Sequence, residues 1–339
     1  MEKLEEIGFY TLEDKRAQNV SSSSPLWRCE MLLTGKCNFK CPYCRGFSAI
    51  SEKCADINPD IAKEVIDIWT KDGLKNIRFS GGEPTFYPYL NELVSMCKDK
   101  DVKRIAISSN GSRDMAIYER LIRNGVNDFS ISLDACCASF GDKMAGVKGH
   151  WEKVTENIKE ISKLTYVTVG IVLTPDNVKD TQAIIEFAHK LGVADIRIIS
   201  AAQYNEIIKG LENISDEILE AHPILKYRVN NLTNNINVRG IQEKDCHRCY
   251  IVQDDSVVIG NDKEAWFFPC VIAMREGCKP IGKVGPNMRK ERMEWSKNHD
   301  TFADPICRKN CLDCLVFYNN KVKGYKANQR LFELLGISQ

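Results

Sequence analysis

Several features that would direct a chain to a membrane, to the cell exterior or to a nucleic acid are missing from this sequence. No apolar run approaches the ~20 residues that span a bilayer, and the acidic residues 1–6 do not resemble a secretory signal. The 47 basic side chains balance 46 acidic ones, which leaves a formal net charge of +1. So neutral a chain gives no electrostatic reason to bind nucleic acid or an anionic membrane. We therefore expect a cytoplasmic protein with neither kind of partner.

Histidine is scarce, whereas cysteine is abundant. The 339 residues include five histidines and 15 cysteines. Disulfide bonds would explain so many cysteines in a secreted chain, but in the cytoplasm metal or redox chemistry is the better explanation. The cysteines are also grouped, with three in residues 37–44 and seven in residues 246–314. A hydrophobic fraction of 43% allows a real core and excludes a disordered or fibrous protein.

Strand and helix patterns alternate through most of the chain. Runs rich in Ile and Val predict short buried strands at 27–33, 76–79, 102–108, 128–133, 166–173 and 195–200. Helical patterns lie between them; the first opens at Asn58 and Pro59 and ends at Gly73. Six such units in a row predict parallel strands, in an open sheet or in a full or partial barrel. In each case functional groups belong at the carboxyl ends of the strands.

The pattern changes near residue 235. Segments 257–259 and 265–268 flank the turn 260–264 and predict a β-hairpin, followed by a charged helix near 287–297 and a short helix around 325–335. We therefore expect a barrel-like body and a small cysteine-rich cap. The proposed division is an N-terminal extension (1–26) with a flexible serine-rich end, a core (27–235), a cysteine-rich domain (236–322) and a C-terminal helix (323–339).

The first group of cysteines, Cys37, Cys41 and Cys44, directly follows the first predicted strand. Three thiolates within eight residues suit a soft metal. Structural zinc and an ordinary four-iron cluster both take four ligands, so three cysteines would leave one iron open for a substrate or cofactor. The alternative is a zinc site that takes its fourth ligand from elsewhere, such as Cys54.

This CxxxCxxC loop, with Tyr43 just before its last cysteine, resembles the signature of radical S-adenosylmethionine (SAM) enzymes. Residues 80–85, Ser-Gly-Gly-Glu-Pro-Thr, follow the second strand and resemble the GGEP motif of the same family. Paired glycines allow close approach of backbone to a ligand, and Glu83 can take an ammonium group. The resemblance covers about residues 27–200, and it implies a partial (β/α)6 TIM-like barrel with a SAM-binding 4Fe-4S cluster on the three cysteines.

The resemblance also implies a set of SAM contacts. Asn110 and Ser132 stand at the next two strand ends, where the family touches the ribose and methionine of SAM. Ordinary capping of strand-to-helix turns is an equally good explanation for each of these two alone. Residues 141–146 resemble the family's substrate-side loop. The expected SAM-binding residues are Tyr43, Gly81, Gly82, Glu83, Asn110 and Ser132.

What the resemblance implies chemically is reductive cleavage of SAM to methionine and a 5′-deoxyadenosyl radical, which abstracts hydrogen from an unactivated carbon. A reduced flavodoxin or ferredoxin is the implied electron donor. The protein supplies positioning and exclusion of water. Few histidines are needed, because this step requires no general base.

The second group of cysteines resembles the SPASM or shorter twitch extension of radical SAM enzymes, which holds auxiliary 4Fe-4S clusters. A minimal site would use Cys249, Cys270, Cys311 and Cys314, with Cys246 able to replace Cys249. Seven cysteines are one short of eight, so we expect one auxiliary cluster, or two with an outside ligand or an open iron. The alternative is a four-cysteine zinc ribbon. The candidate ligands are Cys246, Cys249, Cys270, Cys278, Cys307, Cys311 and Cys314.

The remaining cysteines are expected to be small buried hydrophobes. Cys136 and Cys137 follow the fourth strand and are the pair that could donate hydrogen to a substrate radical. Asp134, Arg197 and Gln203 lie near strand ends where substrate is expected, although a structural role explains each of them as well.

Families with such caps modify ribosomally made peptides, by crosslinking or epimerisation, or oxidise and epimerise sugars and aminocyclitols. Only 36 residues precede Cys37, which is short for a leader-peptide-binding domain and favours a small molecule without excluding a peptide. A rival from another class is a non-catalytic iron–sulfur or zinc protein that acts in binding or sensing.

Overall fold

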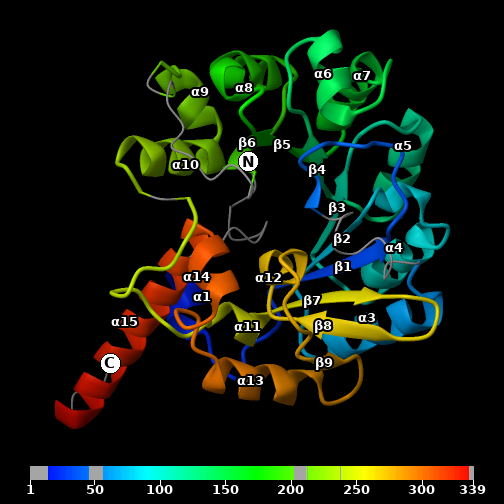
Figure 1. Ribbon diagram of the computed structural model, residues 1–339. Coiled ribbons are helices and arrows are strands. Elements are labelled where there is room, and N and C mark those ends of the chain that lie inside the picture. The colour runs from blue at the N-terminus through cyan, green and yellow to red at the C-terminus, as the bar shows by residue number, and fades with distance from the viewer. Residues whose placement is uncertain (1–13, 46–55, 202–210, 212, 237, 336–339) are drawn as a thin grey trace.

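A single sheet runs through the computed structural model, which describes residues 14–45, 56–201, 211, 213–236 and 238–335. Within this part of the chain nine strands pair in the order β6-β5-β4-β3-β2-β1-β7-β8-β9 (Figure 1). They are β1 (Arg28–Thr34), β2 (Asn76–Gly81), β3 (Arg104–Ser109), β4 (Asp128–Ser132), β5 (Tyr166–Leu173), β6 (Asp195–Ser200), β7 (Asp255–Gly260), β8 (Ala265–Phe268) and β9 (Gly282–Lys283).

Strands β1 to β6 are all parallel, and each pairs with the next along the chain. β7 adds to the other edge of β1 in parallel, and β8 and β9 continue antiparallel. In the described residues β6 and β9 stand at opposite ends of the sheet, so the sheet does not close. The predicted α/β fold with six parallel βα units is confirmed, as a partial barrel. The sheet also continues across the expected boundary at residue 235.

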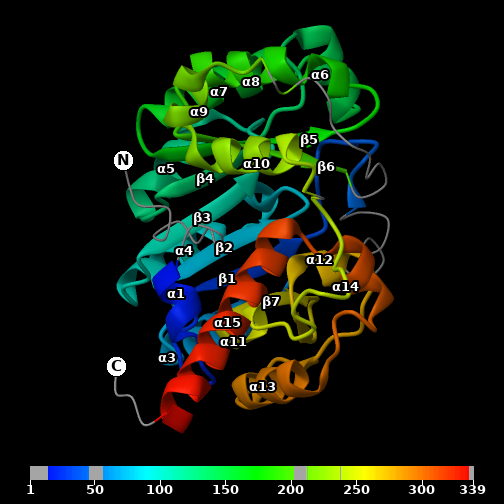
Figure 2. The ribbon, with the colours of Figure 1, turned by 90° about the vertical axis from the view of Figure 1, so that its left-hand side faces the viewer.

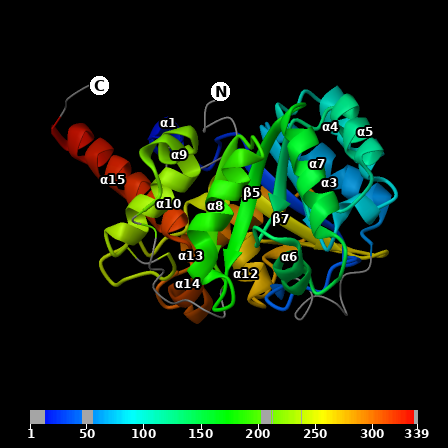
Figure 3. The same cartoon turned by 90° about the horizontal axis from the view of Figure 1, so that it is seen from above.

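Helices join the parallel strands and cover the outer face of the sheet (Figure 3). Outward-facing strand residues such as Met31 and Phe79 pack with Trp69 in one large buried cluster. The helices are α1 (Asp14–Asn19), α3 (Pro59–Lys71), η3 (Pro84–Phe86), α4 (Leu90–Asp99), α5 (Met115–Asn124), α6 (Ala138–Ala145), α7 (Trp151–Ser162), η4 (Val178–Asp180), α8 (Thr181–Lys190), α9 (Asp216–Ala221), α10 (Pro223–Thr233), α11 (Ile251–Asp254), α12 (Val271–Arg275), α13 (Met288–Asn298), α14 (Pro305–Asn310) and α15 (Asp313–Leu335).

The first crossover helix, α3, shows why the sequence signals work. The Asn58 side chain accepts a hydrogen bond from the backbone N–H of Asp60 at 2.9 Å, and Pro59 occupies the first helical position. Gly73 follows the helix with φ +78°, a conformation that favours glycine. The helix therefore begins and ends where the sequence predicts.

The concave face of the sheet is polar. Strand alternation turns Glu30, Arg78 and Asp128 to this side, and they share one row of the register, with Ala106 of β3 between the last two. Arg78 donates to the Ser108 hydroxyl at 3.1 Å and lies 3.6 Å from Asp128. The interior of the partial barrel is therefore built for a polar occupant rather than filled as a dry core.

The two ends of the described chain differ from expectation. The expected extension contains α1, which packs beside α15 (Figure 2). Arg16 of α1 is buried and forms ion pairs with Asp254 at 2.7 Å and Asp255 at 2.8 Å. The serine-rich segment is also held, because Arg289 donates to the carbonyl of Ser24. The described part of the predicted extension thus has contacts with the rest of the chain, and its flexibility stays a prediction.

The C-terminal helix is longer than predicted. α15 begins at Asp313 rather than near residue 325. Cys314 lies in the first turn of this helix, and Asp313 accepts buried hydrogen bonds from Arg228 and Asn231. None of the described helices combines the length and the apolar character needed to cross a bilayer.

Candidate functional site

The first cysteine loop leaves the carboxyl end of β1 and is held by the end of β2. The backbone N–H of Gly82 donates to the carbonyl of Thr34 at 2.7 Å, and that of Glu83 donates to the carbonyl of Lys36 at 2.7 Å. These two bonds fix the start of the loop that carries Cys37. The motif at residues 80–85 therefore acts on the cysteine loop directly.

The paired glycines are required by this contact. A Cβ atom on Gly82 would lie 2.3 Å from the carbonyl oxygen of Lys36, and one on Gly81 would lie 2.4 Å from that of Thr34. Gly81 also has φ +137°, which other residues rarely adopt. The paired glycines therefore allow the end of β2 to approach the backbone of the cysteine loop closely.

Glu83 is fully buried and its carboxylate is engaged by neighbouring donors. One oxygen accepts from the hydroxyls of Thr85 at 2.7 Å and Ser109 at 2.9 Å, and the other accepts from the backbone N–H of Asn110 at 2.7 Å. Burial raises the pKa of Glu83 above its usual range in spite of these bonds. Glu83 thus connects the ends of β2 and β3, and its predicted contact with an ammonium group stays a prediction.

Asn110 reaches the first cysteine. Its amide nitrogen lies 3.7 Å from Sγ of Cys37 and donates to the side-chain oxygen of Asn38 at 2.8 Å. Asn38 in turn donates to the Ser112 hydroxyl at 2.8 Å. Asn38 was missed by the sequence reasoning, although its place inside the CxxxC spacing was a signal that could have identified it. Together these amides hold the loop against the end of β3.

Cys41 and Ser132 line one small cavity of about 40 Å³ between the cysteine loop and the end of β4. Tyr43 also lines it, and its hydroxyl donates a hydrogen bond to Asp134. Asp134 accepts a second bond from the backbone N–H of Val172 at 2.6 Å, and burial raises its pKa to about 6. Two predicted SAM contacts, Tyr43 and Ser132, are therefore adjacent to a predicted cluster ligand.

The substrate-side loop packs against the same cysteine loop. Lys40 donates its backbone N–H to the carbonyl of Ala145 at 2.8 Å. Gly146 has φ +65°, and a Cβ atom there would meet the carbonyl oxygen of Lys40 at 2.4 Å. Residues 141–146 thus close one side of the loop that carries Cys41.

The donor atoms fit an iron–sulfur cluster. Burial raises the pKa of Cys37 and, to about 12, that of Cys41, and the nearby charges of the other thiolates in the loop add to the effect. Cys37 and Cys41, which resist ionisation alone, need a cation to be held as thiolates. Among the described residues this loop offers three thiols, so a four-iron cluster held there would keep one coordination position for another ligand.

The cysteines of the C-terminal part also gather, next to α12 and α14. Burial raises the pKa of Cys249, Cys307 and Cys311, and each of these thiols lies close enough to Cys270 for its charge to contribute. The Cys270 sulfur also caps α12, accepting from the backbone N–H of Ala273 at 3.3 Å. The charge of Cys314 raises the pKa of Cys311 in the same way. A cluster of thiols is therefore present on this side of the sheet.

Cys246 lies at the margin of this group. Its thiol donates to the carbonyl of Arg248 at 3.4 Å, and it packs with Tyr250 and Tyr318 in a separate apolar cluster. The two cysteine regions are linked by an ion pair between Arg45, next to Cys44, and Glu276 of the segment after α12.

Other predicted residues lie apart from the cavity beside Cys41. Cys136 packs against the hydrophobic core, and Cys137 is exposed at the start of α6. Their role as hydrogen donors stays a prediction. Cys54 and Gln203 lie outside the described residues. Two side chains beside Cys307, His299 and Asp304, were missed by the sequence reasoning; their spacing before the cysteine was the available signal.

These features define a partial (β/α) barrel with two groups of cysteines, one of which lies at the carboxyl end of the first strand. The family model of the Radical SAM superfamily matches residues 31–188. This match covers less than half of the chain, and it makes residues 31–188 similar to this superfamily of enzymes, whose members use a 4Fe-4S cluster and SAM. The C-terminal cysteines of the chain are compatible with a SPASM or twitch extension.

Relatives of known sequence share mainly this domain. The chain is 30% identical over 194 residues to a "Probable GTP 3',8-cyclase" of Methanocaldococcus jannaschii, covering 56% of this chain and 64% of the relative. It is 25% identical over 181 residues to a "PqqA peptide cyclase" of Gluconobacter oxydans, covering 53% of this chain and 51% of the relative. The chain therefore spans about half to two thirds of these relatives.

Solved structures share the fold over a longer stretch. "Native anSMEcpe with bound AdoMet" superposes with a TM-score of 0.55 at 16% identity, covering 91% of this chain and 98% of that one. Streptococcus suis SuiB bound to S-adenosylmethionine gives a TM-score of 0.56 at 14% identity, covering 81% of this chain and 66% of that one. At these identities the similarity establishes the fold alone.

Proposed function

We propose that this protein is a radical SAM enzyme in which Cys37, Cys41 and Cys44 hold the SAM-binding 4Fe-4S cluster. When bound, cluster and SAM would together supply the chemistry, in which one electron cleaves SAM to methionine and a 5′-deoxyadenosyl radical that abstracts hydrogen from an unactivated carbon of the substrate. The observation that carries the proposal is the convergence of the three thiols beside a cavity shared by Cys41 and Ser132.

The chain's own residues position and shield this reaction. Glu83 and Gly82 fix the cysteine loop on the ends of β2 and β3. Asn110 and Ser132 face the loop from the ends of β3 and β4, where they would contact SAM together with Tyr43, Gly81 and Gly82. The hydrogen bond from Tyr43 to Asp134 would keep the aromatic ring against the cavity and limit the access of water.

An auxiliary 4Fe-4S cluster is proposed on Cys249, Cys270, Cys311 and Cys314. The charges of neighbouring thiols raise the pKa of Cys249 and Cys311, which supports this site. Cys246 lies at the margin of the group and is therefore the less suitable ligand. This cluster would tune the potential, accept an electron from a substrate radical or bind substrate. We also keep the division into a core at 27–235 and a cysteine-rich domain at 236–322 as a proposal.

The concave face favours a substrate with an anionic group. Arg197 is in register with Gly170, which is in register with Ser132, and its guanidinium lies 3.7 Å from where a Cβ of Gly170 would be. The side chain is exposed in the mouth of the barrel, and no described residue forms an ion pair with it. The positive charge of Arg78 lies near this guanidinium and repels it. A carboxylate or phosphate would relieve this repulsion.

A peptide and a small metabolite can both carry such an anionic group. Relatives are named for a reaction of GTP and for a cyclisation of the PqqA peptide, and one SuiB structure holds its precursor peptide SuiA. For this chain we propose a ribosomally made peptide, for crosslinking or epimerisation, or a sugar- or aminocyclitol-like metabolite, for oxidation or epimerisation. A reduced flavodoxin or ferredoxin would deliver the electron in the cytoplasm, where thiols stay reduced.

The test is formation of 5′-deoxyadenosine and methionine from SAM by anaerobically reconstituted, reduced protein. The assay is run alone and with the small-molecule and the macromolecular fractions of a cell extract, and the stimulating fraction identifies the substrate class. Arg197→Gln should weaken stimulation by the fraction without changing the unstimulated rate. Absence of both products under all conditions, with zinc in place of iron, would instead favour a metal-binding or sensing protein.

A further inference from the structure

The segment from the end of α13 to the start of α14 brings a histidine, a carboxylate and a cysteine together. Nε2 of His299 lies 3.2 Å from Oδ2 of Asp304 and 3.9 Å from Sγ of Cys307. The candidate donor atoms of the three residues all lie within 4.8 Å of one another. All three side chains are partly buried. Nothing in the proposed SAM chemistry uses His299 or Asp304.

These separations suit one metal ion. A tetrahedral site with bonds of about 2.0–2.3 Å has edges of about 3.3–3.8 Å between its ligand atoms. The two contacts of His299 match such edges closely. Ligands of a four-iron cluster stand further apart, because each binds a different iron atom. The geometry therefore points to a mononuclear site and not to a cluster.

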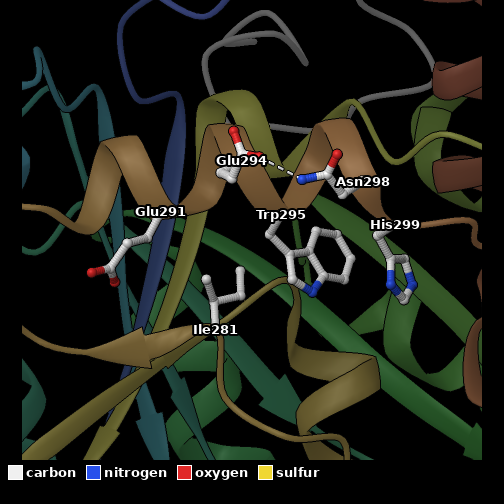
Figure 4. A pocket seen from close by; sticks show the side chains of 6 residues that line it. All are labelled: Ile281, Glu291, Glu294, Trp295, Asn298 and His299. Atoms are coloured by element: carbon white, nitrogen blue, oxygen red, sulfur yellow. Dashed lines mark hydrogen bonds between the residues drawn. The ribbon is translucent and has the colours of Figure 1, made fainter.

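The donors are held in place before any ion binds. Oδ1 of Asp304 caps α14 by accepting from the backbone N–H groups of Ile306 at 2.7 Å and Cys307 at 3.2 Å, which turns Oδ2 toward His299. The imidazole of His299 stacks on the indole of Trp295 with ring centroids 4.0 Å apart (Figure 4). Such support fixes ligand direction and strengthens metal binding.

An ion can reach the site from solvent. His299 borders a surface cavity of about 380 Å³ that is also lined by Glu291, Glu294 and Trp295 (Figure 4). The two glutamates add negative charge to the approach, which favours cations. A site at the margin of the cysteine-rich part can therefore be filled after folding.

We propose that His299, Asp304 and Cys307 bind one divalent transition-metal ion of the zinc type. Mixed sulfur, imidazole and carboxylate donors suit Zn²⁺ or Fe²⁺ rather than Ca²⁺ or Mg²⁺. The site ties the end of α13 to α14, and a water molecule would take the fourth coordination position.

This assignment also divides the seven C-terminal cysteines. Cys307 serves the mononuclear site, so the four cysteines proposed for the auxiliary cluster remain, with Cys246 and Cys278 outside both. The inference stands on the contacts of His299 and Asp304, and it does not depend on SAM cleavage.

The test is the zinc and iron content of the full-length protein after anaerobic cluster reconstitution, equilibration with Zn²⁺ and passage over a chelating resin. The wild type should retain one zinc per chain besides its cluster iron. X-ray absorption at the zinc edge should give one sulfur and three nitrogen or oxygen neighbours. His299→Ala should weaken zinc binding at least about 10-fold against a competing chelator while the iron content stays unchanged.

Two further variants keep the test decisive. His299→Cys should retain zinc and shift its neighbours to two sulfurs, which a merely structural histidine would not do. His247→Ala is the matched control, because His247 also neighbours an aspartate, Asp300 at 3.8 Å, but its contacts there include no thiol; it should keep its zinc. Wild-type protein without zinc, loss of zinc in the control, or loss of iron instead of zinc from His299→Ala would each overturn the assignment.

Discussion

The carboxylate of Glu83 accepts a hydrogen bond from the Ser109 hydroxyl at 2.9 Å, which connects the end of β2 to the end of β3. The same carboxylate accepts from the backbone of Asn110, whose side chain lies against Cys37. The fully buried Glu83 thus fixes the cysteine loop relative to the ends of β2 and β3. Glu83, which the resemblance assigns to SAM binding, therefore also has a structural role at the ends of β2 and β3.

Glu83→Gln tests this task. A glutamine offers one acceptor oxygen and places an N–H₂ donor against donors, so buried hydrogen bonds to a charged group are lost. The free energy of unfolding should fall by about 1.5–3 kcal/mol. It is measured by anaerobic urea denaturation of the reconstituted protein.

The matched control for Glu83 is Glu92→Gln. Glu92 is exposed on α4 and pairs with Lys63 at the surface, so its replacement should change stability by no more than about 0.5 kcal/mol. Equal stabilities of the two variants would show that the buried carboxylate does not hold the strand ends.

Gly82→Ala tests the contact between the GGEP motif and the cysteine loop. The new methyl group would meet the carbonyl oxygen of Lys36 at 2.3 Å, so one of the two segments must move. Such overpacking should cost about 1–3 kcal/mol and loosen the loop. Thermal unfolding and iron content after reconstitution are the measurements. Gly285→Ala is the control, since its Cβ would meet nothing within 4 Å; iron loss in both variants would refute the contact argument.

Cys270→Ala separates the auxiliary cluster from the SAM cluster. If Cys270 is a ligand of the auxiliary cluster, the variant should lose about four iron atoms per chain and still cleave SAM without substrate. Substrate turnover should be impaired. Iron and sulfide analysis, with 5′-deoxyadenosine formation as the second readout, decides the matter. A variant that keeps its full iron content, or one that is colourless but turns over substrate normally, would contradict the assignment.

His222 predicts how stability depends on pH. Burial lowers its pKa from 6.5 to about 4 in the folded protein, and its ring contacts the carbonyl of Ala194 and His189. The unfolded chain therefore binds more protons between these values, so stability is lost as pH falls from about 6.5 to 4. The shift corresponds to at most about 3 kcal/mol.

The pH dependence is measured as the difference between wild type and His222→Gln in urea denaturation. The difference removes neighbouring groups such as Asp195, whose burial raises its pKa to about 7 and acts in the opposite direction. We expect the stability advantage of the wild type to shrink as pH falls from 6.5 to 4. A difference that is constant over this range would show that His222 is not buried as a neutral ring.

The barrel strands could be predicted because each is a short apolar run, and β5 and β6 begin and end where the pattern does. The start of α15 could not, because a CxxxCxxC spacing is compatible with both a loop and the first turn of a helix. Only the buried bonds from Arg228 and Asn231 to Asp313 fix the helix there. Contacts between residues over eighty positions apart leave no local signal.

The site shows the same limit. The cysteines, Gly82 and Glu83 stand in a spacing that carries information by itself. By contrast, Asn38, His299 and Asp304 acquire their places only through folding, which brings Asn38 to Asn110 and Asp304 to His299. Strand register likewise decides that Arg197 lies over Gly170 in the mouth of the barrel.

The central claim is that Cys41 holds the cluster at which SAM is cleaved. Its most direct test is 5′-deoxyadenosine formation by the reduced, reconstituted Cys41→Ala variant, compared with Cys97→Ala, whose thiol is buried in the core under α4. The account predicts that Cys41→Ala makes no product yet remains brown, because the auxiliary cluster is untouched, while Cys97→Ala retains activity. Product from Cys41→Ala at the wild-type rate would contradict the account.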